Sequence, residues 1–312
     1  MNPETKITTD EVRRICARHG VKYLSHDRIT TGFSHEVHRL NDDLILKLFN
    51  KSSNKNFLCE SQVLKVEDSR ILKPKLVASY ESEGDERSYI IMSYVQGRSL
   101  GGIWHLATDV QRERLIQQIS IVLQAFQDIN PEFLKLEEHG SWQNYLDYKS
   151  NKLVDKLLEK SIITKQSSIE VLKVMDRART FFKEDEPVKP VYWDIHFDNF
   201  IVNKDFELQA IIDLENVRIL PLDYPLFVVK KQIAFPQRYL AEEEEKFADK
   251  ADYVHLWNWY KKYYPQMFAY EHLEERVKLY QLLDELHLMI DWSHDSELRE
   301  SFKKLMAELS CI

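Results

Sequence analysis

Residues 191–216 read VYWDIHFDNFIVNKDFELQAIIDLEN, and this stretch decides how the chain folds. Three short β-prone runs alternate here with polar turns, and helical sequence lies on both sides. Asp194, Asn199 and Asp213 each stand just outside one of the runs. The loop between Asp194 and Asn199 brings both side chains to one side, and a hairpin returns Asp213 to the same place. We therefore expect the carboxylates of Asp194 and Asp213 and the amide of Asn199 to lie close together.

The sequence around this stretch divides into a β-rich part and a helical part. Hydrophobic periodicity before residue 97 predicts a helix over 9–20, a β-hairpin over 28–49, a helix over 54–67 and two strands over 72–95. Beyond it, the periodicity predicts helices over 109–129, 141–159 and 165–183, and several more between 238 and 309. We expect an α+β fold with an N-terminal lobe over 1–96 and a larger, mostly helical C-terminal lobe over 97–312.

Charge and glycine content exclude several classes of protein. The 312 residues carry 43 Lys plus Arg against 51 Asp plus Glu, a net charge of −8, which argues against bulk nucleic-acid binding. Glycine occurs seven times, and Gly140 is the last. The chain therefore has neither a G-x-G-x-x-G dinucleotide fingerprint nor a Walker A loop.

Cysteine content and hydropathy indicate the cellular compartment of the protein. Cys16, Cys59 and Cys311 are odd in number and far apart, which fits reduced thiols better than a disulfide framework. The first ten residues are polar, and no window approaches the 18 or so apolar residues of a membrane span. We expect a cytoplasmic protein without a membrane partner.

The spacing of the central polar residues suits phosphoryl transfer from ATP. That reaction needs a carboxylate near the attacking hydroxyl and oxygen ligands for Mg²⁺. Asp194, Asn199 five residues on and Asp213 nineteen residues on provide these groups. Asp194, His196 and Asp198 could instead form the D-x-H-x-D metal cluster of a hydrolase, but no second histidine-rich cluster supplies further ligands.

Two motifs of this stretch resemble those of the aminoglycoside phosphotransferase and choline kinase family, H-G-D-x-H-x-x-N followed by I-D-x-E. Here they read Y-W-D-I-H-F-D-N and I-D-L-E, so that Tyr192 and Trp193 replace the usual histidine and glycine. Tyrosine can still supply a polar scaffold contact. The resemblance implies a protein kinase-like two-lobed fold, with Asp194 as catalytic base or hydroxyl-orienting residue and with Asn199 and Asp213 as Mg²⁺ ligands.

Upstream residues extend this resemblance to about residues 28–228. Lys47 shares a strand face with Ile45 and Phe49, an unusual place for an ammonium group unless an anion meets it. The resemblance implies that Lys47 grips the nucleotide phosphates and that Glu60 positions it. Read without the resemblance, Lys47 could protect a sheet edge and Glu60 could be a solvated helix residue.

The resemblance also implies a nucleotide site for ATP, with GTP as the alternative. The turn with Gly32 and Ser34 would cover the phosphates, because a residue without Cβ lets backbone N–H groups approach them. The run I-I-M-S-Y-V-Q-G-R-S-L resembles the family's hinge, whose backbone from Ser93 to Val95 would pair with the adenine edge.

A small hydroxyl compound is the expected acceptor. The segment after Asp213 is too short to dock a peptide, and D-F-G and A-P-E are absent from the sequence. Residues 215–312 hold 18 acidic and 13 basic residues together with many aromatic ones, which suits an ammonium-bearing substrate. The candidate acceptor ligands are Trp142, Tyr145, Glu215, Asp223, Asp284, Glu285 and Asp291.

We therefore expect ATP-dependent O-phosphorylation of a small, amine-containing alcohol, either aminoglycoside-like or choline-like. Two alternatives stay open at this point. One is a kinase for proteins or for another metabolite class such as sugars. The other is a non-catalytic nucleotide-binding module, for which the departure at Tyr192 is the only sequence indication.

Overall fold

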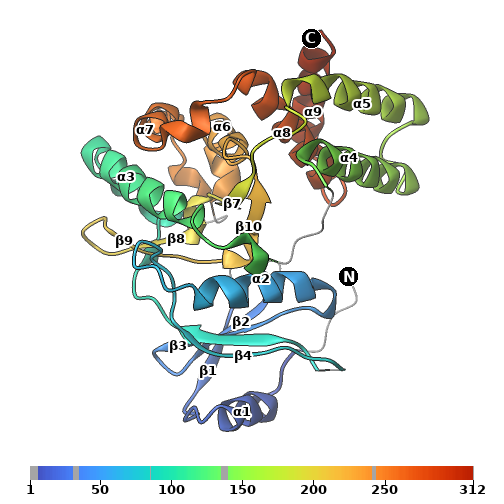
Figure 1. Cartoon of the computed structure of the whole chain (residues 1–312). Helices are drawn as coiled ribbons and strands as arrows, with labels where there is room; N and C mark the ends of the chain where they lie inside the picture. The colour runs from blue at the N-terminus through green and yellow to red at the C-terminus, as the bar shows by residue number, and fades with distance from the viewer. Residues whose placement is uncertain (1–5, 31–34, 85, 135–139, 241–243, 312) are drawn as a thin grey trace.

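A computed structural model describes residues 6–30, 35–84, 86–134, 140–240 and 244–311. Its N-terminal part is a five-stranded antiparallel sheet of order β1-β2-β3-β5-β4 (Figure 1). The elements in chain order are α1 (Thr9–Arg18), β1 (His26–Ile29), β2 (Glu36–Leu40), β3 (Leu44–Leu48), α2 (Asn54–Lys65), β4 (Leu76–Tyr80) and β5 (Tyr89–Ser93).

The two faces of this sheet are buried against different helices. Side chains alternate along a strand, so Leu46 and Leu48 of β3 point to one face and pack with Val12 and Cys16 of α1. The opposite face meets α2, which lies between the sheet and the helical remainder of the molecule (Figure 1). Lys47 therefore points toward α2, as the strand alternation predicts.

The C-terminal part contains two small sheets and most of the helices. Strands β6 (Arg98–Ser99), β8 (Phe200–Val202) and β9 (Leu208–Ile211) form one antiparallel sheet, and β7 (Lys189–Tyr192) pairs with β10 (Val217–Leu220) in the other. The helices are α3 (Asp109–Phe126), α4 (Trp142–Glu159), α5 (Lys165–Ala178), α6 (Leu226–Ala234), α7 (Leu256–Tyr263), α8 (Leu273–Leu288) and α9 (Ser296–Ser310).

Gly97 marks the passage between the two parts at a point of close contact. A Cβ built on this residue would lie 2.6 Å from the carbonyl oxygen of Val202 and 2.6 Å from Ile201 Cγ2. Such contacts cannot be relieved without moving the backbone, so only glycine fits here. The domain division at residues 96 and 97 remains a prediction.

One sequence expectation about the helices is wrong. We expected helical structure to return at residue 238, but α6 begins earlier, at Leu226, and four consecutive apolar residues at its start hide the helical period. Residues 236–239, 245–247 and 250–252 form only short 3₁₀ turns before α7. The N-cap of α1 is Thr8, and its capping box with Glu11 satisfies the first N–H groups of the helix.

None of the helices within the described ranges combines the length and the apolar character that crossing a bilayer requires.

Candidate active site

Lys47 is a buried ammonium surrounded by three carboxylates. Its Nζ lies 2.7 Å from Glu60 Oε2, 2.9 Å from Asp213 Oδ1 and 3.0 Å from Glu215 Oε2. Burial alone would lower the pKa of Lys47, but the three carboxylates raise it well above its usual value. The ammonium therefore stays charged. Carboxylates of the protein itself supply the anionic partner that a lysine on this strand face requires.

Glu60 and Glu215 respond in opposite ways to this crowding. Burial, reinforced by the neighbouring carboxylates, raises the pKa of Glu60 to about 7 although Lys47 opposes the rise. Burial also acts to raise the pKa of Glu215, yet a contact with His35 and the charge of Lys47 lower it to about 2. Glu215 Oε2 lies 2.8 Å from His35 Nε2, and Asn56 Nδ2 donates to Oε1 at 3.3 Å.

These contacts correct the acceptor role expected of Glu215. Its side chain is only 8% exposed and is held on the Lys47 side of the site by Lys47, His35 and Asn56. Glu215 follows Asp213 by two residues within a 3₁₀ turn that packs on α2. That packing buries the side chain beside Lys47.

Asp213 reaches the same ammonium from the other part of the chain. Its backbone is left-handed, with φ 54° and ψ 48°, a conformation that costs free energy for a residue other than glycine. The carboxylate is half exposed, in contrast to Glu60 and Glu215, although it contacts Lys47. One oxygen is therefore engaged by the lysine while the group remains accessible to a ligand.

Asp194 is held by two amides at the end of β7. Asn199 Nδ2 donates to the Asp194 backbone carbonyl at 2.9 Å and to Oδ2 at 3.1 Å, and Asn216 Nδ2 donates to the same Oδ2 at 2.9 Å. His196 Nε2 lies 3.1 Å from Oδ1. These contacts fix the carboxylate in one orientation, which a proton acceptor needs.

Burial raises the pKa of Asp194 above its usual value. His196 and the hydrogen bond from Asn199 oppose this rise, whereas the charges of Asp213 and Asp284 add to it. A raised pKa brings a carboxylate closer to the range in which it exchanges protons at neutral pH.

The two departures from the family motif have structural roles. The Tyr192 hydroxyl donates to the carbonyl of Ile212 at 2.9 Å, so it ties β7 to the residue just before Asp213. This is the polar scaffold contact expected of tyrosine at that position. The Trp193 ring packs edge-on against Tyr224 at 6.1 Å and stacks on Phe227 at 6.1 Å.

The hinge expected at Ser93 to Val95 begins at the last residue of β5. Ser93 N–H donates to the carbonyl of Lys75 at 2.9 Å, and Tyr94 N–H donates to that of Asp43 at 2.7 Å. Within the part of the chain that the structure describes, the Val95 N–H donates to no protein group. Gly32 and Ser34, the residues expected to cover the phosphates, lie outside the described residues.

Four of the expected acceptor ligands belong to α4 and α8. Trp142 stacks on Tyr145 at 5.1 Å and meets Tyr224 edge-on at 5.7 Å. Asp284 is close enough to Asp194 to influence its charge, and it forms an ion pair with Lys231. Glu285 also contacts Lys231, at 3.3 Å, but it is 1% exposed.

Asp223 and Asp291 do not fit the acceptor role. Asp223 is fully buried, and Arg276 donates to its two oxygens at 2.6 and 2.9 Å. Tyr280 adds a hydrogen bond at 3.2 Å. Asp291 is exposed beyond the end of α8 and lies 3.9 Å from Lys160. Asp223 is thus part of a buried ion-pair network, and Asp291 belongs to the surface.

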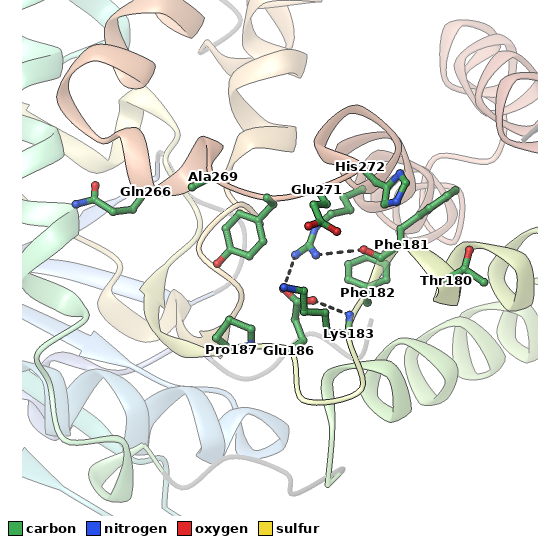
Figure 2. A pocket seen from close by; sticks show the side chains of 12 residues that line it. Thr180, Phe181, Phe182, Lys183, Glu186, Pro187, Gln266, Ala269, Glu271 and His272 are labelled. Carbon is green, nitrogen blue, oxygen red and sulfur yellow. Dashed lines mark hydrogen bonds and ion pairs between the residues drawn. The ribbon is translucent and has the colours of Figure 1, made fainter.

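Figure 2 shows a cavity next to this network, lined by side chains that include Phe182, Lys183, Glu186 and His272. Its volume is about 350 Å³. Arg276 lines it as well, but its charge is already met by Glu186 at 3.0 Å and by Asp223. The charges of Arg276 and Glu186 in its wall are therefore paired with each other.

The alternative D-x-H-x-D metal cluster does not form. Asp198 Oδ1 accepts a hydrogen bond from Ser99 Oγ at 2.5 Å, while His196 contacts Asp194. Across the described ranges, no three His, Cys, Asp or Glu side chains are arranged to hold a metal ion.

Sequence reasoning missed several residues around the site. Asn216 donates a hydrogen bond to Asp194, and His35 contacts Glu215. Lys149 lies near Tyr145 and Tyr224. Asn216 directly follows I-D-L-E, which was a usable signal. Nothing local distinguishes Lys149 from the other lysines of its helix.

Comparison with known proteins finds a matching sequence family and similar folds. The model of the phosphotransferase enzyme family matches residues 26–259. The streptomycin–ATP ternary complex of APH(2")-IIa is 14% identical with a TM-score of 0.67, covering 99% of this chain and 98% of that one. The GDP complex of aminoglycoside 2'-phosphotransferase-IIIa is 16% identical with a TM-score of 0.60, covering 97% and 98%. No curated protein matches the chain by sequence.

Proposed function

Because the chain belongs to the phosphotransferase enzyme family, we propose that it transfers the γ-phosphoryl group of ATP to a hydroxyl of a small, amine-containing molecule. One observation carries this proposal. A buried Lys47, held by Glu60, meets Asp213 from a distant part of the sequence, and Asp194 and Asn199 stand on the same hairpin frame. This is the set of groups that phosphoryl transfer needs.

The nucleotide would bind along the hinge and at Lys47. The unpaired Val95 N–H offers a donor to the adenine edge, and the Lys47 ammonium offers its charge to the phosphates. Two structural neighbours are complexes with ATP and with GDP, which supports a nucleotide site without choosing between adenine and guanine.

Mg²⁺ fits the oxygen donors of Asp213 and Asn199. Asp213 is half exposed, and Asn199 is oriented by its amide nitrogen, which donates to Asp194. Mg²⁺ commonly takes one or two protein oxygens and completes its shell with phosphate oxygens and water. The ion, when bound, neutralises the charge that develops on the phosphates.

Asp194 would orient the acceptor and take its proton. The acceptor oxygen forms a bond to the γ-phosphorus while the bond between that phosphorus and the β,γ-bridging oxygen breaks, and ADP leaves with the electron pair. The proton of the hydroxyl passes to Asp194 and from there to solvent. Asn199 and Asn216 keep the carboxylate in place throughout.

Asp284 supports an amine on the acceptor. It is 22% exposed and close enough to Asp194 to raise the pKa of that residue. Trp193, next to Asp194 in the sequence, packs on Tyr224, and aromatic rings suit a cationic group. A kinase acting on proteins is disfavoured because only eight residues separate Asp213 from Leu222 in the sequence.

Asp194→Ala tests the proposal. We expect kcat to fall by roughly two to four orders of magnitude, the usual loss for a general base or orienting group. Affinity for Mg-ATP should stay within about twofold, because Asp194 does not contact Lys47. His105→Ala serves as a control variant, because the His105 ring stacks on Phe247 and, among the described residues, contacts neither Asp194 nor Lys47. Full activity of Asp194→Ala would refute the assignment.

A non-catalytic nucleotide-binding module is the second candidate. It predicts that ATP with Mg²⁺ raises the melting temperature while no transfer to any acceptor and no hydrolysis can be measured. The hydrogen bond of Tyr192 to Ile212 weighs against it, because the replaced position still supports the loop of Asp213.

A further inference from the structure

Lys149 of α4 has an unusual environment for a lysine. Its Nζ donates to the hydroxyl of Tyr224 at 2.9 Å and lies 5.5 and 5.9 Å from the ring centroids of Tyr224 and Tyr145. The side chain is partly buried. Throughout the described ranges, no carboxylate lies within ion-pair distance of this ammonium.

The other two buried lysines near the site are neutralised by carboxylates. Lys47 has three carboxylate partners, and Lys231 has Asp284 and Glu285. Withdrawing an ammonium from water without such a partner is costly, and a phenol supplies a lone pair but no negative charge. Lys149 is therefore prepared to receive an anion from outside the protein.

Lys149 lies on the side of the site where an acceptor would sit. Tyr224, its hydrogen-bond partner, contacts Trp193, the residue before Asp194. Asp284 is close enough to act on the charges of both Asp194 and Lys149, but its own ion pair is with Lys231. Trp193 and Tyr224 thus connect the surroundings of Asp194 to Lys149.

We propose that the acceptor carries a carboxylate or phosphate group and that Lys149 binds this group while Asp194 holds the hydroxyl. This inference rests on the proposed function and narrows its substrate class to an alcohol with an anionic group. The rings of Trp142 and Tyr145, stacked at 5.1 Å, form an apolar wall beside the lysine. A charge-assisted hydrogen bond in such surroundings is stronger than one between neutral groups.

The same lysine would select against polycationic acceptors. A molecule with several amines brings like charges toward Lys149, whereas one amine near Asp284 and one anion at Lys149 complement both groups. The structure therefore favours a zwitterionic alcohol over a polyamine.

Matched acceptors test the inference. Ethanolamine is compared with serine, and glucosamine with glucosaminate and with glucosamine 6-phosphate, using labelled ATP. We expect transfer to an anion-bearing member in preference to its partner, and the second series separates carboxylate from phosphate. In Lys149→Met, KM for that acceptor should rise about 10- to 100-fold, the loss expected for a hydrogen bond to a charged group. Lys149→Arg should retain most of the affinity.

Lys152 provides a matched control on the same helix. Its Nζ donates to Tyr148 Oη at 3.1 Å and lies 5.3 Å from that ring, but the side chain is exposed. Lys152→Met should leave KM for every acceptor and the affinity for Mg-ATP unchanged. Melting temperatures of both variants show whether either one has lost its fold.

Two results would overturn the inference. One is an anion-bearing acceptor that is used no better than its partner, and the other is an equal effect of Lys149→Met on both members of a pair. If no compound is phosphorylated, binding of serine, glucosaminate and glucosamine 6-phosphate to the Mg-ADP-loaded enzyme decides, and a lack of any Lys149-dependent shift overturns it. Loss of Mg-ATP binding in the unmodified protein would instead mark failure of the proposed function.

Discussion

One ammonium facing three carboxylates is the feature that organises this molecule at the scale of single residues. Lys47 lies within 3.0 Å of Glu60, Asp213 and Glu215. Three carboxylates around one ammonium would leave a net negative charge if all of them were ionised. The three carboxylates differ in burial and in their other contacts, and their pKa values differ accordingly. Glu60 takes the raised pKa of about 7, Glu215 the lowered one of about 2, and Asp213 keeps access to solvent.

Glu215 gives a prediction about stability and pH. Its folded-state pKa of about 2 lies below the value of 4.5 in the unfolded chain, so the ionised form stabilises the fold. That contribution, about 3 kcal/mol by linkage, is present above pH 4.5 and is lost as the pH falls toward 2. Glu215→Gln should therefore show a shallower loss of unfolding free energy between pH 5 and pH 2 in urea titrations.

Glu60 gives the opposite prediction for how the free energy of unfolding depends on pH, and it serves as a comparison within the same protein. Its folded pKa of about 7 lies above the unfolded value, so its contribution is present below pH 4.5 and is lost as the pH rises through 7. Glu60→Gln should change the neutral part of the stability profile and leave the acid part alone. Identical acid limbs in Glu215→Gln and the unmodified protein would contradict the assignment of Glu215.

At the scale of elements, α3 owes its start to a capping box. Thr108 Oγ1 accepts from Gln111 N–H at 3.4 Å, and Gln111 Oε1 accepts from Thr108 N–H at 2.9 Å. The pair satisfies two of the N–H groups that a helix leaves unbonded at its beginning. The buried face of α3, which includes Leu115 and Ile119, is thereby held in register with the core.

Thr108→Ala should lower the free energy of unfolding by about 1 kcal/mol, the usual loss for an N-cap. The measurement is urea denaturation followed by circular dichroism. Gln117→Ala, at an exposed position of the same helix, should be neutral because alanine is a good helix former. Phosphotransfer should be unchanged in both, since neither side chain contacts the site. A Thr108→Ala variant as stable as the original protein would mean that the box adds nothing.

Element by element, the sequence predicted the N-terminal part well. Strand alternation placed Lys47 on the face of α2, and the hairpin of β8 and β9 returned Asp213 to the site. Helix α6 was missed because its first four residues are all apolar, which removes the helical period. Hydrophobic periodicity can be read from a sequence only where one face of the helix or strand is exposed to solvent.

At the scale of the whole molecule, a buried ion-pair network joins segments that are distant in sequence. Arg276 of α8 contacts Asp223, which precedes α6, and Glu186, which precedes β7. Its guanidinium also lies 4.5 Å from the centroid of the Phe182 ring beside the cavity of Figure 2. All three charged side chains are nearly inaccessible to solvent.

Asp223→Ala should lower the free energy of unfolding by about 3–5 kcal/mol, because it leaves Arg276 buried with one partner fewer. Asp291→Ala removes an exposed carboxylate and should change it by less than about 0.5 kcal/mol. Urea denaturation compares the two. Both residues are candidate acceptor ligands by sequence, and neither variant should raise the acceptor KM once folded. A raised KM with unaltered stability in Asp223→Ala would contradict the structural role.

The sequence by itself determined the order of the elements, the strand face of Lys47 and the spacing of Asp194, Asn199 and Asp213, because these follow from local periodicity and turn chemistry. Only the tertiary structure decided which charges are paired. Glu215 joined Lys47, Asp223 joined Arg276, and Lys149 was left bonded to Tyr224 with no carboxylate partner among the described residues. Partners more than 50 residues apart meet through packing, and no local pattern records that.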